Sequence, residues 1–400
     1  MNLCFVTQEI DKVPSGVVSV INQLTSKWNE NDQLFILTNK NHWAYETFKD
    51  NFYNNPHIIL ESLPFILPSE RYFNLTKNIR NIYLLLFIKI LIRPLRWLEM
   101  IVAIIWLKGW LKDRSIYSVI SHNGGWPGGE LNRWIIWSSW LSKTPCRYLV
   151  IHNLPWTPPF FIKPFEFIRN RLIESISTKI ITVSKSCADS LKIGANFKNV
   201  PNVIYNGISY PNNIIKFKNN TQDERIVRIA FVGELHPRKG VDVLINSLEY
   251  IKKPCELILV GSGNSEYEDE LLLLSEKQQW RTKFVGFVSD MEKYYMTFDV
   301  VVLPSIELES FGMTLIEAMS YSIPVVCSDF GGMKEVVKDK LNGYVVLANN
   351  SFLLGKRLDN LVSNPDLRRR MGVAGKERML EKFTADIMAY NYQRLCNADL

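Results

Sequence analysis

The chain has 400 residues, of which 47% are hydrophobic and 22% charged, and its formal net charge is +7. This length exceeds one ordinary core and predicts two domains of roughly 200 residues each. The composition is typical of a soluble globular protein and excludes a largely disordered chain or a multi-span membrane protein. The positive charge fits a phosphorylated substrate or an anionic membrane. Nucleic acid is not expected as a partner, because no zinc-finger, helix-turn-helix or aromatic RNA-binding pattern is present.

The first residues, 1–7, form a short β-like run without a basic leader or an apolar signal core, which predicts a cytoplasmic protein. The six cysteines are scattered, without a Cys-x-x-Cys pair or a neighbouring histidine cluster, so we expect buried thiols and no metal site. They are Cys4, Cys146, Cys187, Cys255, Cys327 and Cys396.

The N-terminal half alternates short apolar runs with amphipathic stretches. This alternation is the βαβ pattern of a parallel sheet covered by helices on both faces. The expected strands are 2–7, 33–38, 117–121, 147–152, 179–184 and 203–206. We therefore predict a Rossmann-like domain over residues 1–207.

One segment near 79–112 departs from this rhythm, since it is highly apolar and carries Lys89, Arg93 and Arg96 on one side of a helical projection. Charges and Pro94 interrupt it before it reaches the roughly 18 uncharged residues that a spanning helix needs. We expect a helix in the membrane interface whose three basic residues meet anionic headgroups. A pair of buried core helices is the alternative.

Residues 121–129 place His122 and Asn123 at the end of an expected strand, followed by a glycine-rich loop. Ligands of open parallel sheets bind beyond the carboxyl ends of the strands. His122 and Asn123 are therefore candidates to approach an acceptor substrate, although the glycines also suit a tight structural connection.

A second βαβ series follows an Asn-rich stretch without clean periodicity, 208–224, which is the expected linker. We predict a second Rossmann-like domain over 225–380, and a final helix, 381–400, that packs back on the N-terminal domain. Two such domains would face each other across a cleft. The expected strands are 226–233, 256–261, 282–287, 299–304 and 323–327.

The first turn of the second series combines Gly233 with Arg238 and Lys239 shortly before a helix. A glycine allows close approach of the backbone, and basic residues at a helix start favour an anion. The pattern indicates either a phosphate site or an ordinary βα turn with solvated charges.

Two carboxylates eight positions apart, Glu309 and Glu317, follow the strand 299–304. Eight helical rises would span about 12 Å, which is comparable to the ribose-diphosphate-sugar of a nucleotide sugar. The amides near Phe311, Gly312 and Met313 lie at the positive end of the next helix and suit a diphosphate. A capping role for Glu309 and an exposed position for Glu317 are the alternative.

The ordered set of 233–240, Glu309-x7-Glu317 and 331–335 resembles the retaining nucleotide-sugar glycosyltransferases of family 4, of the group 1 type with the GT-B fold. The resemblance covers most of the chain and is strongest over 226–346. It implies transfer of a hexose from a nucleoside diphosphate sugar to a hydroxyl of a glycan or lipid-linked acceptor. Bacterial surface polysaccharide synthesis is the expected setting, at the cytoplasmic side of a membrane, and no metal or other cofactor is implied.

The resemblance also implies roles for individual residues. Glu317 matches the glutamate that binds the ribose, and Glu309 the one that faces the donor sugar. Lys239 matches the lysine on the diphosphate, assisted by Arg238 and by the amides at 311–313. Gly286 lies where the family's backbone grips the base. In the N-terminal half, Gly16 matches a glycine that approaches the phosphates, and His152 a histidine near the reacting sugar.

Glu234 stands where the family usually has arginine, which removes a positive partner of the diphosphate. A catalytically silent donor-binding protein is therefore one rival hypothesis, and a sugar-nucleotide epimerase of the same fold is another. A nicotinamide-dependent oxidoreductase is a third, since Gly261 and Gly263 follow a strand. However, Glu266 replaces the third glycine of the dinucleotide fingerprint.

Overall fold

The computed structural model describes residues 1–398 except 10–15, 54, 78, 80, 82, 86–87, 89–92, 156–162, 211–225 and 308. The chain divides into two compact units. The first comprises Met1–Ile204 and Met388–Leu400, and the second comprises Tyr205–Ile387. The expected linker, 208–224, lies mostly outside the described residues, but Ile208 is part of the second unit, where it forms a bridge with Thr384.

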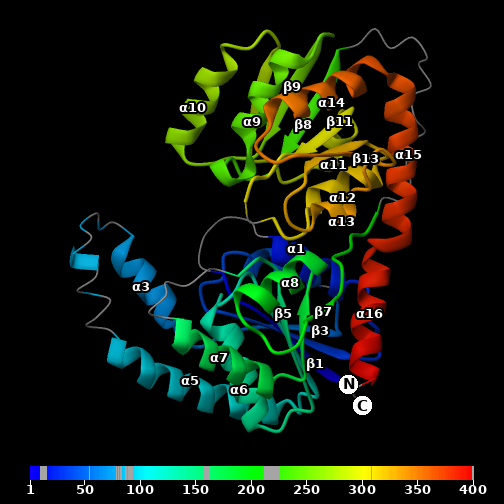
Figure 1. Ribbon diagram of the computed structural model, residues 1–400. Coiled ribbons are helices and arrows are strands. Elements are labelled where there is room, and N and C mark those ends of the chain that lie inside the picture. Colours follow the sequence, from blue (N-terminus) through cyan, green and yellow to red (C-terminus); the bar gives the residue numbers. More distant parts are fainter. Residues whose placement is uncertain are drawn as a thin grey trace. The chain divides into compact units, whose positions relative to one another are not determined.

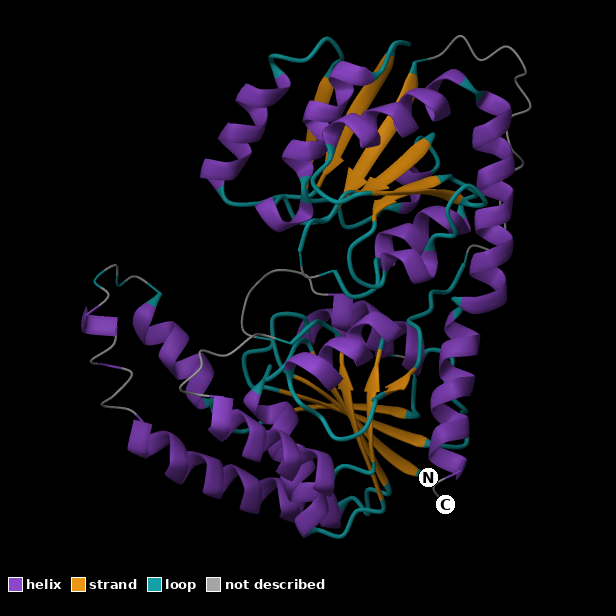
Figure 2. Ribbon diagram, viewed as in Figure 1, coloured by secondary structure: helices purple, strands orange, loops and turns teal. Residues whose placement is uncertain are grey.

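The N-terminal unit is built on a seven-stranded parallel sheet of order β3-β2-β1-β4-β5-β6-β7 (Figures 1 and 2). The central strands are almost completely buried because helices cover both faces, which explains their continuous apolar runs. The strands are β1 (Asn2–Thr7), β2 (Gln33–Thr38), β3 (Ile58–Ser62), β4 (Ser118–Asn123), β5 (Cys146–Ile151), β6 (Lys179–Thr182) and β7 (Asn202–Val203).

The helices of this unit include a layer in which α5, α6 and α7 lie side by side (Figure 1). The described helices are α1 (Gly16–Thr25), α2 (Tyr45–Phe52), α3 (Pro68–Thr76), α5 (Arg93–Asp113), α6 (Glu130–Leu141), α7 (Lys163–Ile176) and α8 (Lys185–Gly194). The last helix, α16 (Ala385–Ala398), packs on the same unit, where the Tyr148 hydroxyl donates to the Leu395 carbonyl at 3.3 Å.

The C-terminal unit contains a six-stranded parallel sheet of order β10-β9-β8-β11-β12-β13. Its strands are β8 (Val227–Val232), β9 (Cys255–Val260), β10 (Thr282–Gly286), β11 (Val300–Leu303), β12 (Val325–Ser328) and β13 (Gly343–Val346). Its helices are α9 (Val241–Ser247), α10 (Ser265–Ser275), α11 (Glu292–Tyr295), α12 (Met313–Ser320), α13 (Met333–Val336), α14 (Ser351–Ser363) and α15 (Pro365–Lys382), with 3₁₀ turns at Pro237–Lys239 and Leu248–Tyr250.

Two parallel α/β units confirm the predicted fold class. The edge strands β3 and β13 were not among the strands expected from the sequence. β3 is only partly buried and β13 has four residues, so neither carries a long apolar run.

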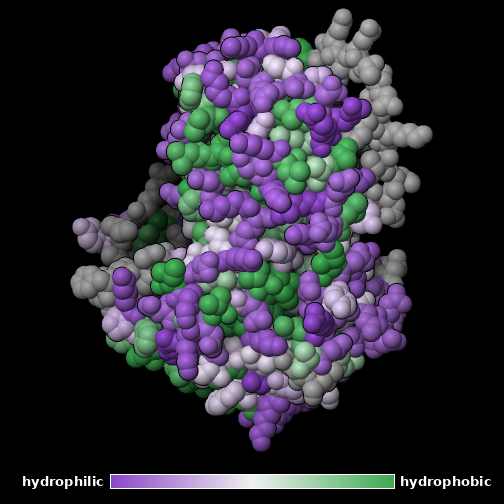
Figure 3. Space-filling view, turned by 45° about the vertical axis from the view of Figure 1, so that its right-hand side comes forward, coloured by the Kyte–Doolittle hydropathy of each residue, from purple (hydrophilic) through white to green (hydrophobic). Residues whose placement is uncertain are grey.

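One face of the protein is mixed in polarity, and the six thiols are buried. On the face drawn in Figure 3, hydrophobic residues are interspersed among hydrophilic ones. All six cysteines lie in the described part of the chain, are buried and form no disulfide, as expected.

Candidate functional site

The centre of the candidate site in the C-terminal unit is an ion pair between Lys239 and Glu309. The Lys239 Nζ lies 2.5 Å from Glu309 Oε2, and the two side chains are only 15% and 13% exposed. The Ser305 hydroxyl also donates to this carboxylate at 3.3 Å. Because β8 and β11 are neighbours, the loops that follow them meet at one edge of the sheet. The fold therefore brings together two predicted residues that are 70 positions apart.

Two glycines hold the loop that carries Glu309. Gly240 has a φ of +64°, and a Cβ added there would lie 2.4 Å from the Pro304 carbonyl oxygen. Gly331 has a φ of +58°, and its added Cβ would lie 1.7 Å from the Glu309 carbonyl oxygen. The Gly332 amide donates to that same oxygen at 3.2 Å. Only glycine combines this backbone conformation with such close approach, so these residues fix the position of the Glu309 backbone.

The second predicted carboxylate, Glu317, lies on α12 and accepts a hydrogen bond from the Tyr295 hydroxyl at 2.7 Å. Burial raises the pKa of Glu317, and the hydrogen bond from Tyr295 partly opposes that shift. Burial and the neighbouring Glu317 raise the pKa of the Tyr295 phenol, so it remains a donor. Tyr295 was not predicted from the sequence, because no local pattern connects it to a carboxylate 22 positions later.

The start of α12 combines a buried aromatic anchor with the first amides of a helix. The Phe311 ring is buried and packs against Tyr205 and Phe383, with centroids 6.1 and 5.7 Å away. Gly312, with a φ of +95°, precedes the helix, and Met313 is its first residue. The first amides of an α-helix have no acceptor within the helix and lie at the positive end of its dipole. Phe311 thus acts through packing, while the amides at 312–313 lie at the positive end of the helix.

Arg238, expected to assist at the diphosphate, is paired with the unusual Glu234. Arg238 Nη2 lies 2.6 Å from Glu234 Oε2. The Arg238 carbonyl accepts the amides of Ile306 and Glu307 at 2.9 and 3.2 Å, and so also supports the Glu309 loop. In this arrangement Glu234 offsets the positive charge of Arg238, which leaves Lys239 as the nearer cation to Glu309.

The glycines considered for a dinucleotide fingerprint have a structural function here. A Cβ on Gly261 would lie 1.8 Å from the Gly233 carbonyl oxygen, and one on Gly263 would lie 1.9 Å from that of Leu235. Gly286, with a φ of +80°, accepts the Gly261 amide at 2.8 Å. These contacts pack the ends of β8, β9 and β10 together, and they account for Gly261 and Gly263 without any bound dinucleotide.

In the N-terminal unit, the two predicted histidines form a buried pair at the ends of β4 and β5. His122 Nδ1 lies 2.9 Å from His152 Nε2, so one ring donates to the other. Burial lowers the pKa of His152 to about 4, and burial together with the neighbouring His152 holds the pKa of His122 well below its usual value. Both rings are therefore neutral at pH 7. Among the described residues, His122 Nε2 has no hydrogen-bond partner.

The other predicted residues of this unit have different surroundings. Asn123 fastens the glycine-rich loop, since its Oδ1 accepts the Gly129 amide at 2.9 Å and its Nδ2 donates to the Pro127 carbonyl at 3.2 Å. Gly16 is the exposed first residue of α1, and a Cβ there would meet no atom within 4 Å. The roles predicted for Gly16 and His152 toward a donor, and for His122 and Asn123 toward an acceptor, stay predictions.

Comparison with known proteins connects this site to a family. Residues 212–378 match the family model of glycosyl transferases group 1. An uncharacterized glycosyltransferase of Methanocaldococcus jannaschii is 32% identical over 231 residues, which are 53% of this chain and 58% of that protein. The chain thus spans little more than half the length of this relative. The capsular polysaccharide biosynthesis glycosyltransferase CapM of Staphylococcus aureus is 24% identical over 66% of this chain and 73% of its own length.

The fold comparison covers the whole chain. The crystal structure of HepE from Anabaena in complex with UDP aligns with a TM-score of 0.70 over 100% of both chains, at 18% identity. The protein therefore has the two-unit GT-B fold, and residues 212–378 are similar in sequence to glycosyl transferases group 1.

Proposed function

We propose that this protein is a retaining glycosyltransferase that moves a hexose from a nucleoside diphosphate sugar to a hydroxyl of a glycan or lipid-linked acceptor. The observation that carries the proposal is the Lys239–Glu309 pair, held by Gly240 and Gly331 within the region that matches the family model. A confined lysine next to a carboxylate supplies a cation for a diphosphate and an acceptor for sugar hydroxyls.

The proposed mechanism depends on stabilising the departing diphosphate. Lys239 and the first amides of α12, around Met313, provide positive charge where negative charge grows in the transition state. Glu309 faces the donor sugar, and Glu317 accepts hydrogen bonds from the ribose hydroxyls. Tyr295 holds the Glu317 carboxylate in position. Gly286 supplies backbone contacts to the base, and no step is assigned to a metal ion.

The relatives support a role in the synthesis of surface polysaccharide. CapM of Staphylococcus aureus is described as a capsular polysaccharide biosynthesis glycosyltransferase, and HepE was crystallised with UDP. We extend these descriptions to a nucleoside diphosphate donor and a glycan acceptor for this chain.

An anionic membrane surface is proposed as a further partner, because α5 exposes an apolar stripe. In the described part of the chain, no helix has the length and apolar character needed to cross a membrane. The inner side of α5 is buried in the core through Ala103, Leu107, Trp110 and Leu111. The outer stripe consists of Trp97 (64% exposed), Leu98, Ile101, Val102 and Ile105, each at least 51% exposed. Exposed tryptophan beside aliphatic residues is typical of a helix at a membrane interface.

The basic residues predicted to meet headgroups are only partly described. Arg96 Nη2 lies 3.5 Å from Oε2 of the buried Glu130, so this ion pair partly neutralises the charge that Arg96 could offer to a headgroup. Lys89 and the side chain of Arg93 lie outside the described residues. We therefore assign the membrane contact mainly to the apolar stripe of α5.

Flotation with anionic liposomes tests the membrane assignment. The double variant Trp97→Ser/Ile101→Ser removes two large apolar side chains, each worth about 1.5–3 kcal/mol when fully buried, and should reduce the bound fraction strongly. The control is Tyr53→Ser, which removes another exposed aromatic ring from the same unit, outside α5. Equal flotation of both variants would contradict the assignment.

A second candidate function is a catalytically silent donor-binding protein. It is favoured by the Glu234–Arg238 pair, which places a negative charge beside a cation expected at the diphosphate. Such a protein would bind nucleotide sugars but would neither transfer nor hydrolyse them.

Donor binding and turnover together distinguish these functions. A thermal-shift panel of UDP-, GDP- and ADP-sugars identifies the donor, because a ligand that binds only the native state raises the melting temperature. With that donor, Lys239→Ala should lower turnover by about 10²–10³-fold, the magnitude found for lost transition-state donors. Glu317→Ala should weaken donor binding about tenfold, equivalent to about 1.4 kcal/mol. Lys253→Ala, an exposed lysine of the same unit, is the control.

The transferase and the silent donor-binding protein predict different results in these assays. Donor binding without transfer or slow donor hydrolysis would favour the silent protein. Full activity of both Lys239→Ala and Glu317→Ala would remove the proposed site.

A further inference from the structure

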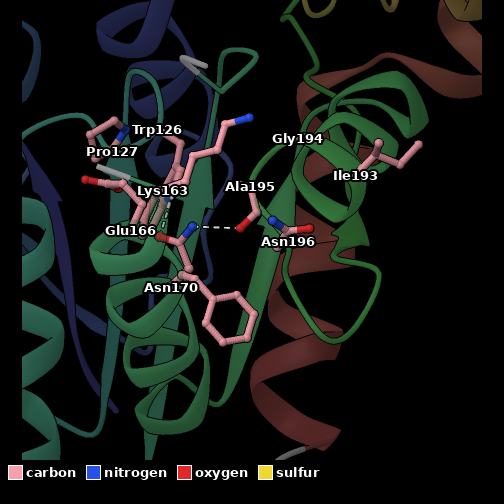
Figure 4. Close-up of a pocket in the computed structure, with 10 residues that line it drawn as sticks. Trp126, Pro127, Lys163, Glu166, Asn170, Ile193, Gly194, Ala195 and Asn196 are labelled. Atoms are coloured by element: carbon pink, nitrogen blue, oxygen red, sulfur yellow. Dashed lines mark hydrogen bonds between the residues drawn. The ribbon is translucent and has the colours of Figure 1, made fainter. Parts of the chain in front are cut away.

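The N-terminal unit contains a cavity of about 220 Å³ that the function described so far does not use (Figure 4). It lies between the first two turns of α7, residues 193–196 at the end of α8, and the glycine-rich loop at 126–127. Since a water molecule occupies about 30 Å³ in the liquid, the cavity has room for about seven waters. A hollow of that volume suits a small ligand such as one sugar ring.

The walls of the cavity are fixed before any ligand arrives. Asn170 Oδ1 accepts the Trp126 indole N–H at 3.1 Å, and Asn170 Nδ2 donates to the Ala195 carbonyl at 2.7 Å, as Figure 4 shows. The Trp126 ring also packs edge-on against Phe197, with centroids 5.3 Å apart. These contacts join the loop, α7 and the end of α8 into one rigid frame, which lowers the entropy lost on binding.

The lining combines an aromatic surface with a few polar groups. Phe167 remains 45% exposed and lines the cavity together with Pro127. Asn196, with a φ of +54°, contributes a side-chain amide from a backbone conformation that asparagine tolerates better than most residues. Apolar walls with a small number of placed polar groups are typical of small-molecule sites. A sugar ring, with an apolar C–H face and polar edges, matches this combination.

The charges around the cavity favour a negatively charged ligand. Glu166, which lines it, is paired with Arg169. Lys163 also lines it and forms no ion pair within the part of the chain that the structure describes. A third cation, Arg133, donates to the Gly128 carbonyl at 2.8 Å, next to Pro127. Once Arg169 neutralises Glu166, the side chain of Lys163 provides a positive charge that no acidic residue in the described part of the chain pairs with.

We propose that this cavity binds one sugar unit of the acceptor, and that Lys163 selects a unit bearing an anionic group, either a carboxylate or a phosphate. The inference rests on the proposed glycosyltransferase function and names the acceptor class. Phe167 and Pro127 contact the apolar face of the ring, while Asn196 hydrogen-bonds its hydroxyls.

Calorimetric titration of the full chain tests this with three probes: methyl glucuronide, glucose 6-phosphate and neutral methyl glucoside. At least one anionic sugar should bind about tenfold more tightly than the neutral one, because a hydrogen bond to a charged group is stronger than a neutral one. Preference for the glucuronide identifies a uronic acid unit, and preference for the phosphate identifies a phosphorylated unit. Equal binding of all three, or no binding, overturns the proposal.

Two variants locate the binding in this cavity. Lys163→Gln should abolish the preference for the anionic sugar and leave binding of the neutral sugar unchanged. Phe167→Ala should weaken both about fivefold, in the range expected for one aromatic contact. Phe165→Ala is the matched control, since this ring is 75% exposed on α7 but does not line the cavity. An effect of Phe165→Ala equal to that of Phe167→Ala would refute the assignment.

The result is separable from the proposed function. Donor binding with no sugar binding here refutes only this inference. Absence of donor binding refutes the proposed function, whatever the cavity binds.

Discussion

Substitution of Gly331 by alanine is the most direct test of how the Glu309 loop is held. The new Cβ would begin 1.7 Å from the Glu309 carbonyl oxygen, which must retreat by about 1.3 Å to reach a 3.0 Å contact. The positive φ lowers the free energy of unfolding by about 1–2 kcal/mol, and overpacking against the Glu309 carbonyl lowers it by about 1–3 kcal/mol more. A displacement of about 1 Å in a catalytic group typically costs on the order of 100-fold in rate. We therefore expect both lower stability and a large loss of transfer activity.

The matched control is Gly286→Ala in the same unit. Gly286 also has a positive φ, of +80°, but a Cβ there would meet no atom within 4 Å. In stability this variant should lose only the conformational contribution, about 1–2 kcal/mol; because Gly286 is itself proposed to contact the base, it serves as a control for stability and not for transfer. Calorimetric unfolding of the full chain compares the stability of the two variants, and initial rates of sugar transfer measure the activity of Gly331→Ala. An equal decrease in melting temperature for both variants, or normal transfer by Gly331→Ala, would refute the reasoning about close approach.

Two further predictions follow from buried polar pairs. Tyr295→Phe removes the donor to the half-buried Glu317, so stability should fall by about 1–3 kcal/mol and donor affinity should decrease; unchanged donor affinity would show that Tyr295 does not position Glu317. The pKa of His152 is about 4 when folded and 6.5 when unfolded, so the unfolded chain binds its proton more readily. Its contribution to stability is present above pH 6.5 and decreases toward pH 4, by about 2 kcal/mol at pH 5. Urea unfolding at pH 8 and 5 should show a smaller decrease for His152→Gln than for the natural chain, and an equal decrease would contradict the prediction.

The fold was predictable because the burial of each central strand on both faces leaves a continuous apolar run in the sequence. β1 and β2 were predicted with the bounds that the structure has. Edge strands bury less, and β3 therefore escaped detection. The apolar segment that contains α5 was recognised, and Pro94 lies at the start of that helix. It is the second residue of α5, where a missing N–H has no intrahelical acceptor to lose.

The candidate site was predictable to the extent that residue type and order reveal it. Lys239, Glu309 and Glu317 stood out in the sequence because glycine turns and acidic residues after strands form a pattern along the chain, and the structure pairs the first two. The hydrogen bond from Tyr295 and the pairing of Glu234 with Arg238 were not predicted. Such contacts depend on side-chain positions that a linear pattern does not contain.

The amino-acid sequence by itself determined that two parallel sheets form and that basic and acidic residues follow particular strands, because periodic burial is a local property. Only the tertiary structure decided that Lys239 meets Glu309 and that His122 meets His152. Those contacts arise where neighbouring strands end at one edge of a sheet, and the order of strands in a sheet is set by the packing of the whole unit.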